Sequence, residues 1–279
     1  MLFYKKIKLE IGTDVTSILG IEKYEPEILG QSHLKLPWAI RKFYQIKWKL
    51  SSLFITKEQK KKRGGSFPSF ISKTDEERIQ NLDIRKFQGL EYEESEKIDG
   101  TSCTFYYNNS EFGVCSRNNK LGLVLDEKGE PTGPHGGAYW KIAKKYNLEE
   151  TLPKLCDQAI ENKLNIAIQG EIVGPGIQGN KYKLTEYEFF VFKIYNIDKR
   201  EYVSSDFRRI LCEALKIKHV PILSIKPFNF KDTAEVLAYV EGRSVICSST
   251  EREGIVFKAI DGSHSFKAIN NKFLLKHEE

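Results

Sequence analysis

This chain is organised around the stretch Glu96-Lys97-Ile98-Asp99-Gly100, which runs directly into the strand-like residues 101–107. Lysine is an unusual nucleophile, because an ordinary pKa of about 10.4 leaves almost no neutral amine at pH 7. Burial and neighbouring cations favour the neutral form and allow a lysine to attack, and Gly100 permits a ligand to approach the backbone closely. For this pattern alone, the alternative is a turn that precedes a strand.

Later stretches add charged residues in or at the end of predicted strands. They are Ser116-Arg117-Asn118, Gln169-Gly170-Glu171-Ile172-Val173-Gly174, Glu253-Gly254-Ile255-Val256-Phe257-Lys258 and Ser265-Phe266-Lys267-Ala268. The order Lys, Arg, Glu, Glu, Lys resembles that of the covalent nucleotidyltransferases, which include ATP-dependent DNA and RNA ligases and mRNA capping enzymes. Several motifs in one order are far more specific than any one of them.

Within that superfamily, residues 67–71 and 73–81, the run 174–180 and residues 266–276 resemble the Deinococcus/Naegleria-type RNA ligases, and the similarity covers roughly residue 11 to the end. The resemblance implies an α+β nucleotidyltransferase fold (the ATP-grasp-like fold of ligase catalytic domains), in which antiparallel sheets are flanked by helices and ATP lies between them. It also implies ATP-dependent joining of RNA 3′-hydroxyl and 5′-phosphate ends through a lysyl-AMP and an adenylylated 5′ end, in RNA repair.

Length and composition describe an ordinary chain without membrane or secretion signals. With 40% hydrophobic and 29% charged residues in 279 positions, it suits one large domain or two small ones. No apolar run is long enough to span a bilayer, and lysines interrupt the N-terminus where a signal peptide would be apolar. Five scattered cysteines argue against zinc and disulfides, which predicts a reducing, cytoplasmic compartment. The net charge of +6 permits a polyanionic partner, but a pI of about 8.8 does not by itself indicate nucleic acid.

The chain is expected to divide near its N-terminus. We predict an N-terminal segment at residues 1–30, which holds at most the last strand of the OB-fold domain that the resembled family carries, and a catalytic domain at residues 31–279. Residues 38–49 interleave basic and aromatic side chains, which either stack on single-stranded nucleic acid or form an amphipathic helix. Residues 57–63 predict a solvated basic loop with salt-dependent affinity for phosphates. We expect a monomer that holds its RNA weakly through these residues.

Residues 74–82 predict a helix, because Thr74 and Glu77 form a capping box. Arg78 would lie on that helix, where it either pairs with Asp75 at the surface or contacts phosphate. The resemblance places this segment against the triphosphate and makes Arg78 an ATP contact.

Residues 101–107 and 112–117 predict a hairpin, which would place Lys97 and Arg117 near one end of the same sheet. Residues 253–269 predict a second hairpin with an Asp-Gly turn. Further strands are predicted at residues 163–171 and 187–195, and helices at 138–146, 148–162, 204–215 and 232–241.

The resemblance also assigns the roles of the basic residues. Lys97 attacks the α-phosphorus of ATP and expels pyrophosphate. Lys267 is the cation beside the α-phosphate and helps to keep Lys97 neutral. Arg117 binds the 5′-phosphate of the nucleic acid or orients the phosphate of the adenylate. Phosphoryl transfer depends on such positioning and charge neutralisation, and the expected partner is RNA, as a nicked duplex or as ends.

Two carboxylates complete the predicted site. By resemblance, Glu171 contacts the ribose, and Glu253 contacts the hydration shell of a divalent metal with Asp99 nearby; Mg²⁺ or Mn²⁺, bound mostly through water, suits this chemistry. Strand-end carboxylates without such motifs are usually surface charges. Phe192 matches the aromatic that stacks on adenine, although aromatics on strands usually belong to the core. The remaining ATP-binding candidates are Glu96, Ile98, Gly100 and Lys258.

Two positions depart from the family pattern. The stacking aromatic is often followed by Asp, but here by Lys193. The last motif often reads Lys-x-Lys, but its second lysine is replaced by Ile269; either Lys272 or Lys258 supplies the missing charge, or one lysine suffices. The alternatives are an ATP-dependent DNA ligase or other covalent nucleotidyltransferase, and a catalytically silent RNA-binding module. The intact Lys, Arg, Glu, Glu, Lys set argues against the silent module.

Overall fold

The computed structural model describes residues 64–133, 136–158 and 164–277. By backbone contacts the chain divides into two units, residues 1–55 and 56–279, and all the described ranges belong to the second. The predictions for residues 1–63, which include the N-terminal segment, the basic and aromatic stretch and the basic loop, lie outside the described residues.

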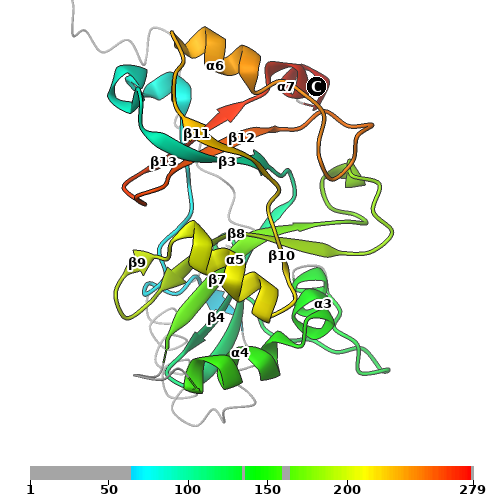
Figure 1. The fold of residues 1–279 in the computed structure, drawn as a ribbon. Helices are drawn as coiled ribbons and strands as arrows, with labels where there is room; N and C mark the ends of the chain where they lie inside the picture. Colours follow the sequence, from blue (N-terminus) through cyan, green and yellow to red (C-terminus); the bar gives the residue numbers. More distant parts are fainter. Residues whose placement is uncertain (1–63, 134–135, 159–163, 278–279) are drawn as a thin grey trace, which may run out of the picture. The chain divides into compact units, whose positions relative to one another are not determined.

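Two sheets form the frame of the described part (Figure 1). The first consists, in spatial order, of β1 (Gly65–Ser66), β6 (Asn119–Lys120), β5 (Glu111–Ser116), β4 (Thr101–Asn108), β7 (Ile166–Val173), β8 (Glu188–Asn196) and β10 (Lys218–His219), with β9 (Glu201–Tyr202) beside β8. The second consists of β11 (Ile222–Pro227), β3 (Glu91–Lys97), β12 (Gly254–Ala259), β13 (Ser265–Ile269) and β2 (Glu77–Arg78). Among these strands only β8 with β10 and β13 with β2 pair in parallel. The predicted α+β fold with antiparallel sheets is confirmed.

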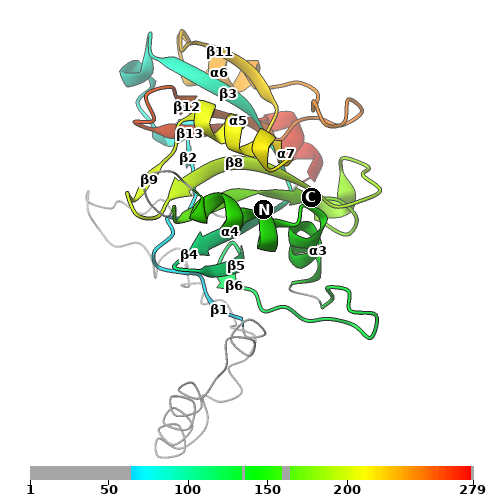
Figure 2. The same cartoon turned by 60° about the horizontal axis from the view of Figure 1, so that its bottom comes forward.

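Helices cover each sheet on one side (Figures 1 and 2). The first sheet carries α3 (Gly137–Lys145), α4 (Leu148–Asp157) and α5 (Ser205–Ala214), whose Trp140, Leu152 and Leu211 share one buried core with Phe105 and Phe189 of the sheet. Burial of a large apolar side chain stabilises a fold by about 1.5–3 kcal/mol. No helix in the described ranges is long and apolar enough to cross a membrane.

The second sheet has a core of its own, built largely from aromatic rings. Tyr92, Phe228, Phe257 and Phe266 are buried and pack with centroids 5.1 to 6.3 Å apart. α6 (Thr233–Tyr239) and the 3₁₀ turns Ile79–Asn81 and Ile84–Phe87 cover this core, α7 (Asn271–His277) follows β13, and a further turn spans Gln178–Asn180. The main cores of the two sheets are separate, and two smaller clusters lie around Tyr106 and Ile98. Side chains of either sheet can line the space between the sheets.

α5 ties the two sheets together. Arg208 donates from Nη2 to both oxygens of Glu93 on β3, at 2.7 and 2.9 Å, and from Nη1 to the carbonyl of Phe192 on β8, at 3.1 Å. Burial alone would raise the pKa of Glu93, but the Arg208 guanidinium holds it below its ordinary value. Such a buried pair resists separation, because removal of one charge leaves the other buried without a partner.

A bulge in β8 sets the position of Phe192. Gln169 pairs with Lys193 and Gly170 pairs with Val191, so Phe192 is an additional residue between them. Lys258 donates from Nζ to the same Phe192 carbonyl. Bulges re-aim side chains, and this one turns Phe192 toward the space between the sheets.

Most of the predicted elements are confirmed. β4 and β5 form the expected hairpin, and its turn residues Asn109 and Ser110 have φ of 49° and 63°, as a tight hairpin turn requires. β12 and β13 form the second hairpin. Ser204 caps α5, because its Oγ accepts from the Phe207 amide at 3.2 Å. α4 is shorter than predicted and ends at Asp157.

The helix predicted over residues 74–82 is wrong. The backbone of Glu77 and Arg78 pairs in parallel with Phe266 and Lys267, and only residues 79–81 make a 3₁₀ turn. A ladder with a buried strand satisfies these backbone groups better than an isolated turn of helix, so the capping-box signal does not decide the structure.

Candidate active site

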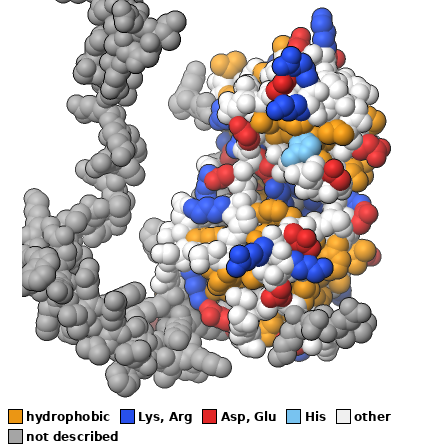
Figure 3. Space-filling view, turned by 90° about the vertical axis from the view of Figure 1, so that its left-hand side faces the viewer, with side chains coloured by type: hydrophobic (Ala, Val, Ile, Leu, Met, Phe, Trp, Pro, Cys, Tyr) orange, Lys and Arg blue, Asp and Glu red, His pale blue; other side chains and the backbone are white. Residues whose placement is uncertain are grey.

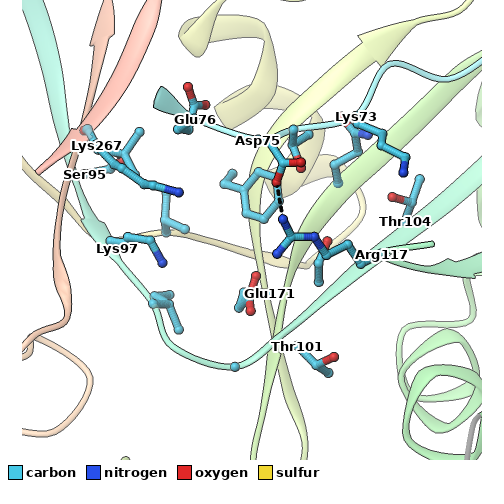
Figure 4. Close-up of a pocket in the computed structure, with 18 of the residues that line it drawn as sticks. Lys73, Asp75, Glu76, Ser95, Lys97, Thr101, Thr104, Arg117, Glu171 and Lys267 are labelled. Atoms are coloured by element: carbon cyan, nitrogen blue, oxygen red, sulfur yellow. Dashed lines mark hydrogen bonds and ion pairs between the residues drawn. The ribbon is translucent and has the colours of Figure 1, made fainter. Parts of the chain in front are cut away.

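A pocket of about 370 Å³ lies between the two sheets. Among the residues that line it are nine of the predicted site residues, namely Glu96, Lys97, Ile98, Gly100, Arg117, Glu171, Phe192, Lys258 and Lys267. Figure 4 shows Lys97 and Lys267 on one side of this space and Arg117 on the other, with Glu171 between them. Asp99, Glu253 and Arg78 lie close by without lining it.

The prediction that Lys97 and Arg117 lie on the same sheet is wrong. Lys97 ends β3 of the second sheet, whereas Arg117 follows β5 of the first. The short link through Gly100 crosses from one sheet to the other, and a Cβ there would lie 2.3 Å from the Ile172 carbonyl oxygen. Only glycine allows this approach, which brings the two sheets together at the pocket.

Lys97 and Glu253 form an ion pair at the base of the second sheet. Gly254 pairs with Lys97 in the ladder, and Lys97 Nζ donates to Glu253 Oε1 at 2.6 Å. Burial raises the pKa of Glu253, and the nearby lysine opposes that shift. The other oxygen, Oε2, is buried and has no hydrogen-bond partner among the residues described. One carboxylate therefore holds the candidate nucleophile and keeps an oxygen for something else.

Glu171 lies on β7, directly across the ladder from Ser102. Burial raises its pKa to about 8; Lys97 opposes the shift, and the negative charges of Glu253 and Asp99 add to it. With this pKa the carboxyl group is mostly protonated at neutral pH. It can exchange hydrogen bonds with a hydroxyl group of a ligand.

Lys267 projects from β13, and Arg78 stands beside it in the parallel ladder. Burial lowers the pKa of Lys267, and the charges of Lys97 and Arg78 lower it further. Three cations crowded at one place repel one another, and a polyphosphate would relieve that repulsion. Arg78 thus adds charge to the site from strand β2 rather than from the predicted helix.

Arg117 stands apart from these cations. It makes an ion pair with Asp75, with Nη2 2.6 Å from Oδ1, and both side chains are about two-thirds exposed. An exposed pair of this kind is weak, because water competes for both charges. A phosphate group could therefore replace Asp75 at little cost. The expected alternative, a pair of Asp75 with Arg78, is not formed.

Asp99 is held away from the pocket. Its carboxylate pairs with Lys181, and its backbone amide donates to the Tyr182 hydroxyl at 2.8 Å. Lys181 and Tyr182 were missed by sequence reasoning, since they lie 82 and 83 positions further along the chain with no local pattern to link them. The only available signal is that they follow the family-like run 174–180.

Lys193, which departs from the family pattern, has partners on two other segments. Its Nζ lies 2.5 Å from Glu76 Oε1 and donates to Ser265 Oγ at 3.0 Å, and Ser265 in turn donates to Glu76 Oε2 at 2.6 Å.

Burial, with Arg208 nearby, lowers the pKa of Lys258 to about 7. Ile269 is buried, so no charge comes from that position. Lys258 lines the pocket, whereas Lys272 pairs with Glu241.

The charged residues on one face of the described part give no comparable focus. Figure 3 shows one face of the described part, on which Lys and Arg side chains are interspersed with Asp and Glu. That mixture agrees with the modest net charge, and it directs attention to the pocket rather than to this face.

Comparisons with known proteins agree with the site. The model of the RNA ligase family matches residues 90–273. Solved structures of the Naegleria gruberi RNA ligase with pyrophosphate, and of its variants with AMP and manganese or with ATP and manganese, are similar to this chain. They are 35–36% identical to it with a TM-score of 0.68, and the matches cover 96% of this chain and 68–69% of theirs. No curated protein matches.

Proposed function

Because this chain belongs to the RNA ligase family, as an ATP-dependent RNA ligase that uses a divalent metal, we propose that Lys97 is the residue that receives AMP. The observation that carries the proposal is the meeting of Lys97 with Glu253, Glu171 and Lys267 around one pocket, although they belong to different strands. Three of the four have a shifted pKa, and such shifts cluster at functional sites.

The spacing between candidate site residues in the sequence also supports this assignment. Solved variants of the Naegleria enzyme change a lysine and an aspartate two positions apart, and a glutamate and a lysine fourteen positions apart. Lys97 with Asp99, and Glu253 with Lys267, have the same spacings.

In the first step Lys97 Nζ attacks the α-phosphorus of ATP, an N–P bond forms, and the bond to the pyrophosphate oxygen breaks. The ammonium group must first lose a proton, and Glu253 Oε1 already accepts that hydrogen bond at 2.6 Å. Burial raises the pKa of Glu253, which favours its taking the proton. Lys267 neutralises charge on the reacting phosphate.

The residues present fit a divalent metal near Glu253. Its Oε2 is buried without a partner among the described residues, and Asp99 adds negative charge beside it. Mg²⁺ or Mn²⁺ held there through water would offset the charge of the phosphates. In the described ranges no three His, Cys, Asp or Glu side chains form a cage for a metal ion.

In the later steps the AMP passes to the 5′-phosphate of RNA, and the 3′-hydroxyl then displaces AMP to form the phosphodiester bond. Arg117 binds the 5′-phosphate in place of Asp75, because both side chains of the Arg117–Asp75 pair are exposed. We place this activity in RNA repair, carried out by a monomer in a reducing compartment that contains RNA.

A sealing assay tests the assignment of Lys97. The wild-type chain should seal a nicked RNA duplex with ATP and Mg²⁺, whereas Lys97→Ala should not. Lys97→Ala should still seal an RNA whose 5′ end already carries AMP, because that step needs no lysyl-AMP. Sealing by Lys97→Ala with ATP at the wild-type rate would contradict the proposal.

A further inference from the structure

Gln169 is a pocket residue that the steps above do not use. It lies on β7, lines the pocket and is 2% exposed. Its Nε2 donates to the carbonyl oxygen of Ser72 at 2.8 Å. Its Oε1 is buried and has no partner among the described residues. A buried acceptor without a partner is uncommon in folded proteins and calls for an explanation.

The bond to Ser72 fixes which end of the amide meets the pocket. A backbone carbonyl can only accept, so the nitrogen of Gln169 must face Ser72 and the oxygen must face elsewhere. The site therefore presents an acceptor, and it would repel a phosphate. The expected ligand group is a donor, such as an amine or a hydroxyl.

The neighbours of Gln169 suggest that the ligand group bound beside it is a flat ring. In the ladder it stands opposite Lys193, and the bulged Phe192 is the next residue on that strand. Phe192 from the first sheet and Val256 from the second both line the pocket. The ammonium of Lys193 is engaged by Glu76 and Ser265, and it does not donate to Gln169 Oε1. The pocket that Gln169 lines therefore also contains apolar side chains from both sheets.

A ribose hydroxyl is the weaker candidate for this acceptor. Glu171 is two positions further along β7, so its side chain is on the same face about 7 Å away. Glu171 offers a carboxyl to the ribose and is close enough to Lys97 for that charge to act on its pKa. The group that reaches Gln169 belongs to another part of the nucleotide, and the exocyclic amine of adenine is the donor that remains.

We propose that Gln169 Oε1 accepts a hydrogen bond from the 6-amino group of adenine and so selects ATP; this inference rests on the nucleotide site proposed above. Guanine and hypoxanthine carry an oxygen at that position, which would set acceptor against acceptor. Recognition of this kind discriminates strongly, because a wrong ligand leaves a buried polar group unpaired.

The test compares Gln169→Met with wild type on two nucleotides, ATP and purine riboside triphosphate, which lacks the 6-amino group. With α-labelled nucleotides, wild type should form the covalent adduct at least tenfold more efficiently from ATP. Gln169→Met should lose at least tenfold with ATP and less than about threefold with the analogue. The preference for ATP should therefore nearly disappear.

Thr104→Val serves as the control, because Thr104 is buried opposite Gln169 on the neighbouring strand. It should keep the wild-type ratio between the two nucleotides, whatever it does to the absolute rate. An equal loss with both nucleotides in Gln169→Met would overturn the inference and leave Gln169 as a support for Ser72.

Binding to Lys97→Met separates this inference from the proposed function. In that background, with and without Gln169→Met, affinities for the same two nucleotides require no chemistry. A tenfold preference for ATP that depends on Gln169 supports the inference even if no adduct ever forms, in which case only the role of Lys97 fails. No dependence on Gln169 overturns the inference even if Lys97 is adenylylated.

Discussion

Two of the arginine–carboxylate pairs in the described part, Arg208 with Glu93 and Arg117 with Asp75, are chemically alike and differ in their surroundings. Arg208 and Glu93 are 3% and 0% exposed and join α5 to β3, whereas Arg117 and Asp75 are 67% and 66% exposed beside the pocket. Breaking a buried pair leaves an uncompensated charge, but breaking an exposed pair costs little. The buried pair therefore holds the sheets that shape the pocket, and the exposed pair keeps a cation ready for a phosphate.

Removal of the buried arginine should have the largest effect on stability. Arg208→Ala should lower the free energy of unfolding by roughly 3–5 kcal/mol, because Glu93 would stay buried without its main partner. Urea unfolding measures this loss. The matched control is Arg209→Ala, since Arg209 also contacts Glu93, at 2.9 Å, but is one-third exposed; it should lose far less. Equal losses in the two variants would refute the distinction.

Removal of the exposed arginine should change chemistry rather than stability. Arg117→Ala should shift the free energy of unfolding by less than about 1 kcal/mol. It should slow the transfer of AMP to a 5′-phosphorylated RNA at least tenfold, because the phosphate loses a charged partner. Formation of the lysyl-AMP should change much less. Single-turnover rates for the two steps provide the measurement.

Asp75→Asn is the matched control for the same pair. It removes the competing carboxylate while Arg117 remains, so AMP transfer should be unchanged or faster. If Asp75→Asn slowed transfer as much as Arg117→Ala, the pair would act as a unit and the exchange with phosphate would be wrong.

This comparison also shows what the sequence could predict. The β4–β5 hairpin and the cap of α5 depend on neighbouring residues, and both were predicted correctly. The helix over residues 74–82 was predicted from equally local signals and is wrong, because its residues pair with β13, almost two hundred positions away. Local signals are reliable only where distant strands do not compete for the same backbone.

The site divides in the same way. The motifs identified Lys97, Glu171 and Lys267 by residue type and order, and the structure brings them together around the pocket. Nothing in the sequence connects Gln169 with Ser72, because their bond joins a side chain to a backbone carbonyl. Such contacts become visible only when the register of the sheet is known.

The smallest expected effect concerns a buried carboxyl that has no arginine. The pKa of Glu171 is about 8 in the folded chain and 4.5 as a free group. A raised pKa means that the folded state binds the proton more tightly, so this stabilisation is complete below about pH 4.5 and is lost as the pH rises through about 8. Glu171→Gln cannot titrate. The melting temperature of Glu171→Gln relative to that of wild type, both measured without nucleotide or metal, should therefore rise by a few degrees between pH 5 and pH 9. Parallel curves would show that Glu171 stays solvated.

The most direct test of the central claim is to map the attached nucleotide. The wild-type chain is incubated with ATP and Mg²⁺, digested, and examined by mass spectrometry for a peptide that carries AMP. The account predicts one AMP on Lys97, lost when pyrophosphate is added and absent from Lys97→Ala. AMP on a different lysine, or AMP at the full level in Lys97→Ala, would contradict it.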